Sequence, residues 1–262
     1  MNPLSVVIIT LNEEHNIVDC IRCAKLISDD IVVVDTGSQD STVSLAVKSG
    51  AEVFSIKWEG YGASRNFGAS KAKHNWILAL DADERISEKL ALTIHQLELS
   101  DCNCIYRFHR KNFLGQEKIQ FGTPGFETVK RIYNRSYAKW DLTLVHEKLM
   151  CTRPVKKKIT GHIDHYGSRN ETDYKAKAVL YAQMSAEKYF IQGKRTNWLK
   201  RYSSPLFNSA KSYLFQLGFL DGKQGWVVAR TIAWYSWLKY FYLHQLWKEA
   251  KTKEISFATE AR

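Results

Sequence analysis

The sequence predicts an α/β fold, in which a mostly parallel, doubly wound sheet is followed by a helical C-terminal extension. Two observations support this prediction. Over the first hundred residues, short runs of β-branched residues alternate with helical patterns, which is typical of consecutive β-α-β units. From about residue 173 onward the pattern is helical, with aromatic and basic residues interleaved. A chain of 262 residues can bury a core large enough for one large domain and an appendage.

The first two strands are predicted at residues 5–10 and 30–35, which read SVVIIT and DIVVVD. Neither run alternates polar and apolar residues, so we expect both strands to be buried on both faces of a parallel sheet. The helical spacing of apolar residues predicts a helix over residues 13–27 between them. The other elements of this part are a helix at 40–49, a strand at 51–56, a helix at 68–73 and a strand at 76–80.

Residues 101–150 have a different character. Strand patterns appear at residues 104–108 and 128–133, and glycines and a proline mark the loops. We interpret this part as an α+β elaboration of the parallel sheet. The first domain is therefore predicted to cover residues 1–170, with its two halves meeting at about residue 100.

The C-terminal extension is predicted to cover residues 171–262. Its helical pattern breaks near Gly193 and again at residues 203–205. The apolar stretch 226–247 is interrupted by charged residues, and no apolar run reaches the roughly eighteen residues that a membrane span requires. We therefore expect interfacial or core helices rather than a transmembrane helix.

Positive charge is concentrated in the last part of the chain. Residues 1–150 hold 18 basic and 19 acidic side chains, whereas residues 194–262 hold 12 and 4, a net charge of +8 out of +11 for the whole chain. Basic and aromatic residues in combination indicate a membrane surface or a nucleic acid, although the aromatic residues would equally serve as the core of a helical subdomain. Residues 194–262 hold five of the eight tryptophans, namely Trp198, Trp226, Trp234, Trp237 and Trp247.

The five cysteines are an odd number without the spacing of a disulfide framework, which favours reduced thiols. Cys20 and Cys23 form a CxxC pair within a helical pattern. No second pair follows at zinc-binding spacing, so we expect a structural role for them. The N-terminus lacks a basic segment and a cleavage site, and we do not expect it to be a signal peptide.

Polar and acidic residues follow three of the predicted strands. Ligands of open parallel sheets bind beyond the carboxyl ends of the strands, so these positions are candidates for a binding site. A dinucleotide site would need a glycine-rich turn after the first strand, and the sequence has none there. The three segments are Thr10–Glu13, Asp35–Ser38 and Asp81–Glu84.

Asp81 and Asp83 stand two residues apart at the end of the fourth predicted strand. A carboxylate pair in this position can bind one divalent cation whose remaining ligands are phosphate oxygens. Such an ion would neutralise the charge on a departing diphosphate. The alternative is that these acids only cap a helix that begins near Glu84.

Four segments taken together resemble the family 2 glycosyltransferases, inverting enzymes of the GT-A fold that use nucleotide-sugars. They read VVIITLNEE, IVVVDTGSQDST, WEGYGASRNFG and WILALDADE, and they occur over residues 4–90 in the order and spacing of that family. The resemblance implies a UDP-sugar donor and a divalent metal, Mg²⁺ or Mn²⁺, as cofactor. It also implies that the catalytic domain, 1–170, has a nucleotide-sugar half over about 1–100 and an acceptor half over about 101–170.

The resemblance further implies roles for individual residues. Asp35 is expected to hydrogen-bond the base or the ribose, and Arg65 to contact the diphosphate, although a lone arginine is often no more than a solvated surface charge. Asp83 is expected to be the more direct metal ligand of the DxD pair. The full nucleotide-sugar site implied by the resemblance comprises Thr10, Leu11, Asn12, Glu13, Asp35, Gly37, Ser38, Arg65, Asp81, Ala82 and Asp83.

Transfer also needs a base that takes the proton of the acceptor hydroxyl. The segment WDLTLVHE, residues 140–147, resembles an element of a bacterial subgroup of this family and implies Glu147 as the base. Asp141 is a rival for that role. His146 would orient the base or touch the phosphates, or else be an ordinary hydrogen-bonded histidine.

Two further histidines, His162 and His165, lie in the segment GHIDHYGS, which is also similar to the subgroup. The resemblance implies that one of them completes the metal shell. We assign His165 to this shell, together with Asp83 and Asp81.

The segment GFLDGKQG, residues 218–225, and the aromatic helical pattern after it resemble the lipopolysaccharide inner-core glucosyltransferases. These enzymes transfer glucose from UDP-glucose to a heptose of a lipid-anchored core. The resemblance implies a lipid-linked saccharide acceptor and a cytoplasmic protein that is peripheral on the cytoplasmic face of the inner membrane. There the basic, aromatic-rich extension would meet an anionic membrane surface.

Two other functions are compatible with the sequence. The same chemistry would serve a polyprenyl-phosphate, capsule or peptide acceptor. A protein of another class would bind nucleic acid or membrane without catalysis, as the isoelectric point of about 9.3 allows. The acids at the strand ends argue against nucleic acid, because they repel phosphates unless a metal intervenes.

Overall fold

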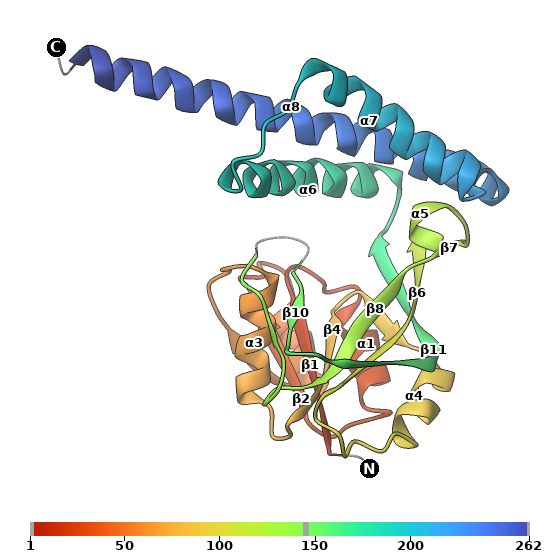
Figure 1. Cartoon of the computed structure of the whole chain (residues 1–262). Coiled ribbons are helices and arrows are strands. Elements are labelled where there is room, and N and C mark those ends of the chain that lie inside the picture. The colour runs from red at the N-terminus through yellow and green to blue at the C-terminus, as the bar shows by residue number, and fades with distance from the viewer. Residues whose placement is uncertain (1–2, 144–146, 261–262) are drawn as a thin grey trace. The chain divides into compact units, whose positions relative to one another are not determined.

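The computed structural model describes residues 3–143 and 147–260, with residues 253–260 described by backbone alone, and it confirms the predicted α/β fold (Figure 1). The chain divides into two compact units. The sheet unit comprises Met1–Phe113 and Phe126–Gly167, and the helical unit comprises Leu114–Gly125 and Ser168–Arg262. Residues 114–125, within the predicted first domain, therefore belong to the helical unit. The functional division of the chain stays a prediction.

The parallel half of the sheet consists of the strands that the sequence predicts. In the register of β1, Thr10 lies beside Asp35 of β2, and Ile9 lies beside Asp81 of β4. The three strands therefore end together, so the loops that follow them meet at one edge of the sheet. The parallel strands are ordered β3-β2-β1-β4, with bounds β1 (Leu4–Thr10), β2 (Ile31–Asp35), β3 (Glu52–Ser55) and β4 (Trp76–Asp81).

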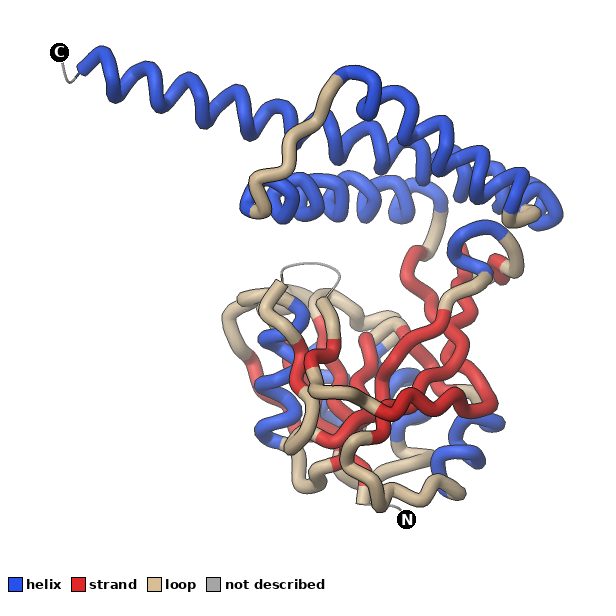
Figure 2. The backbone as a smooth tube through the Cα atoms, viewed as in Figure 1, coloured by secondary structure: helices blue, strands red, loops and turns tan. Residues whose placement is uncertain are grey.

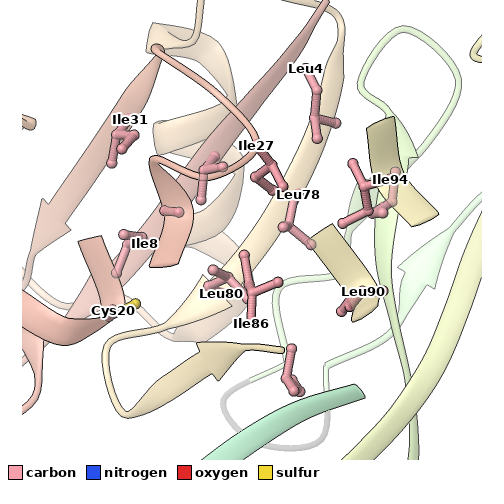
Figure 3. Close-up of a cluster of buried hydrophobic side chains, with 14 of the residues drawn as sticks. Leu4, Ile8, Cys20, Ile27, Ile31, Leu78, Leu80, Ile86, Leu90 and Ile94 are labelled. Carbon is pink, nitrogen blue, oxygen red and sulfur yellow. The ribbon is translucent and has the colours of Figure 1, made fainter. Parts of the chain in front are cut away.

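Successive residues of β1 alternate between two buried clusters, because side chains of a strand point to opposite faces of the sheet. Val6 and Ile8 belong to one cluster, and Val7 and Ile9 belong to the other. The first cluster also contains Cys20, which agrees with a structural role for this thiol (Figure 3). The helices that complete this cluster are α1 (Ile17–Ala24), α2 (Thr42–Lys48) and α4 (Glu88–His95).

The helix α3 (Tyr61–Lys71) packs on the second cluster and begins seven residues before its predicted start at residue 68. The predicted start was wrong because the helix includes glycines that fit close contacts with distant residues. A Cβ at Gly68 would overlap the side chain of Val7, and a Cβ at Gly62 would overlap the carbonyl oxygen of Asp141. These glycines therefore let the helix approach its neighbours closely.

Antiparallel strands extend the same sheet beyond β4, in the order β4-β8-β6-β11-β5. The predicted strand patterns at 104–108 and 128–133 are confirmed, and the first of these strands continues to Leu114. The bounds are β5 (Glu84–Ile86), β6 (Cys104–Leu114), β8 (Thr128–Asn134) and β11 (Val155–Ser168), and β9 (Lys139–Trp140) pairs with β10 (Leu149–Met150) in a separate ladder.

The helical unit is dominated by three long helices (Figure 2). The predicted break near Gly193 is confirmed, but the predicted break at residues 203–205 is wrong, because α7 continues through Pro205. Proline removes one helical hydrogen bond, and here its ring is buried. The elements are β7 (Glu117–Ile119), α5 (Gly122–Gly125), α6 (Glu171–Ile191), α7 (Trp198–Ala210), a π-helical turn η1 (Lys211–Phe215), a 3₁₀ turn η2 (Gly218–Asp221) and α8 (Gly222–Glu260). Among the helices of the described residues, none is long and apolar enough to cross a membrane.

Candidate active site

The loops after β1 and β2 are joined by hydrogen bonds. The amide of Asn12 donates to Ser38 Oγ (2.8 Å), and Asn12 Oδ1 accepts from the amide of Gln39 (2.8 Å). The amide of Glu13 donates to Thr42 Oγ1 at the start of α2 (2.8 Å). Asn12 has a φ of 54°, a left-handed conformation that asparagine tolerates better than most residues. The predicted nucleotide-binding residues on the two loops thus form one ordered surface.

Asp35 shapes the second of these loops. Its Oδ2 accepts from the amides of Gly37 and Ser38, both at 3.1 Å, and its side chain is buried. Gly37 has a φ of 111°, a conformation that a residue with a Cβ rarely adopts. On the first loop Leu11 is exposed, and Thr10 Oγ1 is buried without a hydrogen-bond partner in the described part of the chain. The contact of Asp35 with a base or ribose stays a prediction.

Asp81 and Asp83 do not cap a helix. The segment after them is strand β5, and helix α4 begins only at Glu88. Ser87 is the N-cap of that helix, since its side chain accepts a backbone amide of the first turn. The capping interpretation of the two acids is therefore wrong. Both acids take part instead in a network of charged side chains where β4 ends.

Asp81 lies between two buried guanidinium groups. Arg65 Nη2 donates to Asp81 Oδ1 (2.6 Å), and Arg131 Nη2 donates to Asp81 Oδ2 (2.7 Å). Burial alone would raise the pKa of Asp81, but the charges of Arg131 and Arg65 outweigh it and hold this pKa well below its ordinary value. Because arginines engage both carboxylate oxygens, the arrangement favours Asp83 over Asp81 as a direct metal ligand.

Asp83 and His165 lie side by side. Asp83 Oδ2 is 3.4 Å from His165 Nε2. His165 Nδ1 is 2.6 Å from Asn112 Oδ1, so a protonated Nδ1 donates to this amide oxygen and fixes the ring. Burial lowers the pKa of His165, but the charge of Asp83 and the hydrogen bond to it have the larger combined effect, so the pKa is above its ordinary value. A carboxylate and an imidazole nitrogen therefore face each other just after β4.

These two groups fit a divalent ion that also binds phosphate oxygens. Within residues 3–143 and 147–252, no group of three or more His, Cys, Asp or Glu side chains is placed to hold a metal by itself. Mg²⁺ commonly binds one or two protein groups and completes its shell with substrate phosphates and water. The residues present thus suit an ion shared with a diphosphate rather than a closed structural metal site.

Glu84 is the centre of a buried charge network that sequence reasoning missed. Its side chain is 0% exposed, and its Oε2 accepts from the amide of Asp81 (3.0 Å). Its Oε1 accepts from Arg131 Nη2 (2.8 Å) and Arg110 Nη1 (3.3 Å). Burial lowers the pKa of Arg131, but the carboxylates of Asp81 and Glu84 have the larger effect and raise the pKa of Arg131 far above its ordinary value. In the sequence, Arg131 is a single arginine beside the apolar residues of β8. A surface arginine can stand at such a position too, so the sequence alone did not indicate the network.

Arg110 extends the network toward His165. Its Nε and Nη2 donate to the two carboxylate oxygens of Glu127 (3.0 and 2.6 Å). Asn112 Nδ2 donates to Glu127 Oε2 (3.1 Å), and Asn112 Oδ1 contacts His165. A continuous series of hydrogen bonds therefore joins Asp81 to His165 through residues of the antiparallel strands. These strands hold the metal-ligand candidates in place.

Arg65 joins the predicted base to the DxD segment. It is 3% exposed, and its Nη1 donates to Glu147 Oε1 while its Nη2 holds Asp81. Its guanidinium carbon lies 4.8 Å from the ring centroid of Trp140. The alternative of a solvated surface charge is therefore wrong for Arg65. Through this arginine, Glu147 is brought to the ends of the parallel strands from a distant part of the sequence.

The other predicted groups make different contacts or lie outside the described residues. Asp141 Oδ1 accepts from the hydroxyl (2.7 Å) and the amide (3.3 Å) of Thr143, within its own loop. His162 Nε2 lies 2.9 Å from Lys111 Nζ, in a separate group of side chains. His146 lies outside the described residues.

The chain is similar to known glycosyltransferases. Residues 5–163 match Glycosyl transferase family 2. The lipopolysaccharide core biosynthesis glycosyltransferase LpsC of Rhizobium meliloti (strain 1021) is 28% identical over 253 residues, which cover 90% of this chain and 90% of that protein. An uncharacterized glycosyltransferase of Rickettsia typhi is 27% identical over 258 residues, which cover 94% of this chain and 88% of that protein.

Among solved structures, glucosyl-3-phosphoglycerate synthase of Mycobacterium tuberculosis in complex with phosphoglyceric acid matches 42% of this chain and 44% of that chain, at 24% identity and a TM-score of 0.34. The family match is far more extensive, since residues 5–163 are more than half of the chain and contain the strand-end site. The family that the four sequence segments predict is confirmed. The chain belongs to Glycosyl transferase family 2.

Proposed function

We propose that this glycosyltransferase is an inverting enzyme that moves a hexose, specifically glucose, from a UDP-sugar to a lipid-linked saccharide acceptor of the lipopolysaccharide core or a related envelope glycan. One observation carries the proposal. Arg65 joins Glu147 to Asp81 at the end of β4, and Asp83 follows two residues later and lies beside His165. Sugar transfer from a nucleotide needs a cation for the diphosphate, a metal-binding acid and a base.

The joined loops after β1 and β2 are the proposed seat of the nucleotide. Their backbone is ordered by the hydrogen bonds of Asn12 and Asp35, so little conformational entropy would be lost on binding. The buried hydroxyl of Thr10 is a hydrogen-bonding group in this surface that a ligand can satisfy. These features support the predicted site from Thr10 to Glu13 and from Asp35 to Ser38.

Arg65 is proposed to exchange partners when the donor binds. In this structure it pairs with Asp81 and Glu147. A diphosphate carries more negative charge than one carboxylate and would compete for the guanidinium. Transfer of Arg65 Nη1 from Glu147 to a phosphate oxygen would free the Glu147 carboxylate to accept the proton of the acceptor hydroxyl. Donor binding would thereby prepare the base.

Asp83 and His165 are the proposed protein ligands of Mg²⁺ or Mn²⁺. A divalent ion bound there would neutralise charge on the diphosphate leaving group. Neighbouring side chains hold these ligands and the chain beside them in place. Asn112 fixes the ring of His165. Glu84 accepts from the backbone amide of Asp81, and Arg131 donates to the side chain of Asp81. Two ligands supported in this way would require little rearrangement when an ion and a diphosphate arrive together.

Glu147 is a better base than Asp141 by position. Glu147 contacts Arg65, which in turn contacts Asp81, so its carboxylate lies with the donor-binding groups. Asp141 is engaged by Thr143 in a local turn. A carboxylate that stabilises its own loop is a poorer candidate for reaching an acceptor hydroxyl.

The nature of the acceptor is proposed from the relative LpsC, whose printed description is a lipopolysaccharide core biosynthesis glycosyltransferase. That similarity extends over 90% of this chain and so includes the helical unit. A lipid-linked acceptor would place the enzyme at the cytoplasmic face of the inner membrane. The net charge of +8 over residues 194–262 supports a membrane surface rather than an acceptor in free solution.

The proposal is tested by release of UDP from a panel of UDP-sugars, in the presence of extracted lipid-linked core saccharide and Mn²⁺ or Mg²⁺. We expect release that needs the acceptor and the cation and is fastest with UDP-glucose. Asp83→Asn is expected to lower the rate by about 10–100-fold or more. Asp164→Asn is the matched control. Asp164 precedes the proposed ligand His165 in β11, and neighbouring residues of a strand point to opposite faces of the sheet, so we expect this change to leave the metal site intact. Equal rates for Asp83→Asn and the wild type would refute the proposed metal site.

A further inference from the structure

We propose that the outer surface of α7 and the turns η1 and η2, which we call the α7 face, inserts into the interface of an anionic phospholipid bilayer. The inference rests on the proposed function, which gives the enzyme a lipid-linked acceptor, and it identifies the surface that meets the lipid. The α7 face is made by the exposed apolar residues Trp198, Leu199, Tyr202, Leu206, Phe207, Leu214, Phe215, Leu217, Phe219 and Leu220, and Ile191 at the end of α6 is exposed as well.

The exposure of these side chains is extreme for apolar groups. Trp198 is 76% exposed, Leu206 is 73% exposed and Phe215 is 79% exposed. Isolated exposed apolar residues are common on protein surfaces, but these follow one another through a single stretch of thirty residues. A segment with this many exposed apolar side chains favours a contact with another molecule or a membrane.

The orientation of α7 is the reverse of that of an ordinary surface helix. Trp198, Tyr202 and Leu206 follow at four-residue spacing and therefore lie on one side of the helix, which is exposed. The opposite side packs on α8 and includes polar groups: Asn208 Nδ2 donates to Ser236 Oγ (3.0 Å), and the Arg201 guanidinium carbon lies 5.0 Å from the ring centroid of Trp237. Two side chains that water would favour, Arg201 and Asn208, thus contact α8, whereas Trp198, Tyr202 and Leu206 are exposed.

The charge of the segment identifies the occupant. Residues 194–220 contain five basic residues and no aspartate or glutamate. Lys194, Lys200 and Lys211 are exposed among the apolar side chains. Lysine stems can lie along apolar groups while their ammonium groups reach lipid phosphates, which is the composition of interfacial helices.

A second copy of the chain is a poorer occupant of this face. In a two-fold dimer, the α7 face of one copy would contact the α7 face of the other. Basic residues would then lie opposite basic residues with no acid between them. Nucleic acid would also meet the charge and could stack on the aromatic side chains of this face, but it would leave the leucine side chains among them without an apolar partner. An anionic bilayer satisfies both the charge and the aliphatic side chains.

The structure also corrects which tryptophans can reach lipid. Trp247 packs on Phe190 with ring centroids 4.7 Å apart, and its Nε1 donates to the carbonyl oxygen of Lys194 (2.8 Å). Trp237 stacks on Phe241 within the helical unit. These two side chains are half-buried against other aromatic rings, whereas Trp198 is exposed.

The test is co-sedimentation of the full chain with vesicles of phosphatidylcholine, with and without about a quarter phosphatidylglycerol. We expect the anionic vesicles to bind at least about tenfold more tightly, since each basic residue near anionic lipid contributes a factor of roughly five. The triple variant Trp198→Ser, Leu206→Ser, Phe215→Ser is expected to lose binding by more than about tenfold. The matched control is Val47→Ser with Leu92→Ser, which removes exposed apolar groups of the sheet unit and should bind like the wild type.

Three readouts keep this inference separate from the proposed activity. Binding of UDP-glucose by calorimetry should be unchanged in the triple variant, which shows that the variant is folded. Failure of every form of the protein to bind UDP-glucose would refute the proposed donor while leaving the vesicle result to stand. Wild-type protein that stays in the supernatant with anionic vesicles overturns the α7 face as a lipid surface. So does sedimentation velocity that shows a dimer lost in the triple variant, or binding of DNA by the wild type that is lost in that variant.

Discussion

Arg131 of the sheet unit is a buried cation, whereas Leu206 of the helical unit is an exposed apolar side chain. A buried cation is unusual, and so is a segment with as many exposed apolar side chains as the one that contains Leu206. The sheet unit compensates the buried charge with two carboxylates, those of Asp81 and Glu84. No comparable compensation covers Leu206 within the described residues, which is why a molecule outside the chain is required there. A buried charge such as Arg131, whose partners lie in the chain, therefore helps to build the candidate site. An exposed apolar residue such as Leu206, which belongs to a segment of similar residues, indicates an interface.

Arg131→Met should give the largest loss of stability. The change leaves Asp81 and Glu84 as buried carboxylates with fewer cations, and breaking a buried pair costs about 3–5 kcal/mol. The free energy of unfolding, measured by urea titration, reports this directly. Lys130→Met on the same strand is the matched control, because Lys130 is exposed. A loss below about 1 kcal/mol for Arg131→Met would show that the network does not support the fold.

Glu147→Gln should abolish transfer while donor binding is retained. Removal of a general base lowers the rate by about 10²–10⁴-fold. The measurement is UDP release in the presence of acceptor, alongside calorimetry of UDP-glucose with Mn²⁺. Asp141→Asn is the comparison variant and should stay within about tenfold of the wild type. The reverse order of the two variants would transfer the base role to Asp141.

The stability of the sheet unit should decline in acid. Burial opposes the ionised form of both Asp81 and Glu127, but their arginine partners outweigh it and lower both pKa values. A carboxylate whose pKa is lower in the folded state stabilises the protein above its unfolded pKa of about 4, and this contribution is lost as pH falls toward the folded pKa. Urea midpoints should therefore decrease below about pH 5. A flat profile from neutral pH down to about pH 3 would contradict the network.

Leu206→Ser should change stability least. The side chain is exposed, so its replacement should alter the free energy of unfolding by less than about 0.5 kcal/mol. The same urea titration used for Arg131→Met provides the measurement. A loss above about 1.5 kcal/mol would mean that Leu206 is packed in solution, and the contrast between the two units would then disappear.

Much of the fold could be predicted because β1, β2 and β4 are continuous apolar runs followed by acids, a local pattern. The start of α3 could not, because Gly62 and Gly68 are required by contacts with Asp141 and Val7 that lie far away in the sequence. The passage of α7 through Pro205 depends in the same way on packing within the helical unit.

The candidate site divides along the same line. Asp81 and Asp83 could be predicted from their position at a strand end, and Arg65 and Glu147 could be predicted from the family resemblance. The network of Glu84, Arg110, Asn112, Glu127 and Arg131 depends on pairing between strands that are distant in sequence, so single positions carried no signal for it. The exposed face of α7 could not be predicted for a similar reason. Helical periodicity in the sequence shows which residues share a side of the helix, but it does not show which side packs on another helix.

The central claim is that the edge of the parallel sheet holds a sugar nucleotide through its diphosphate and a divalent ion. Isothermal calorimetry of the full chain with UDP-glucose, with Mn²⁺ present and then removed by a chelator, tests it most directly. The account predicts binding with the ion and a loss of affinity of at least about tenfold without it, or in Asp83→Asn with the ion present. Absence of heat with any UDP-sugar and either cation, from a protein shown to be folded, would contradict it.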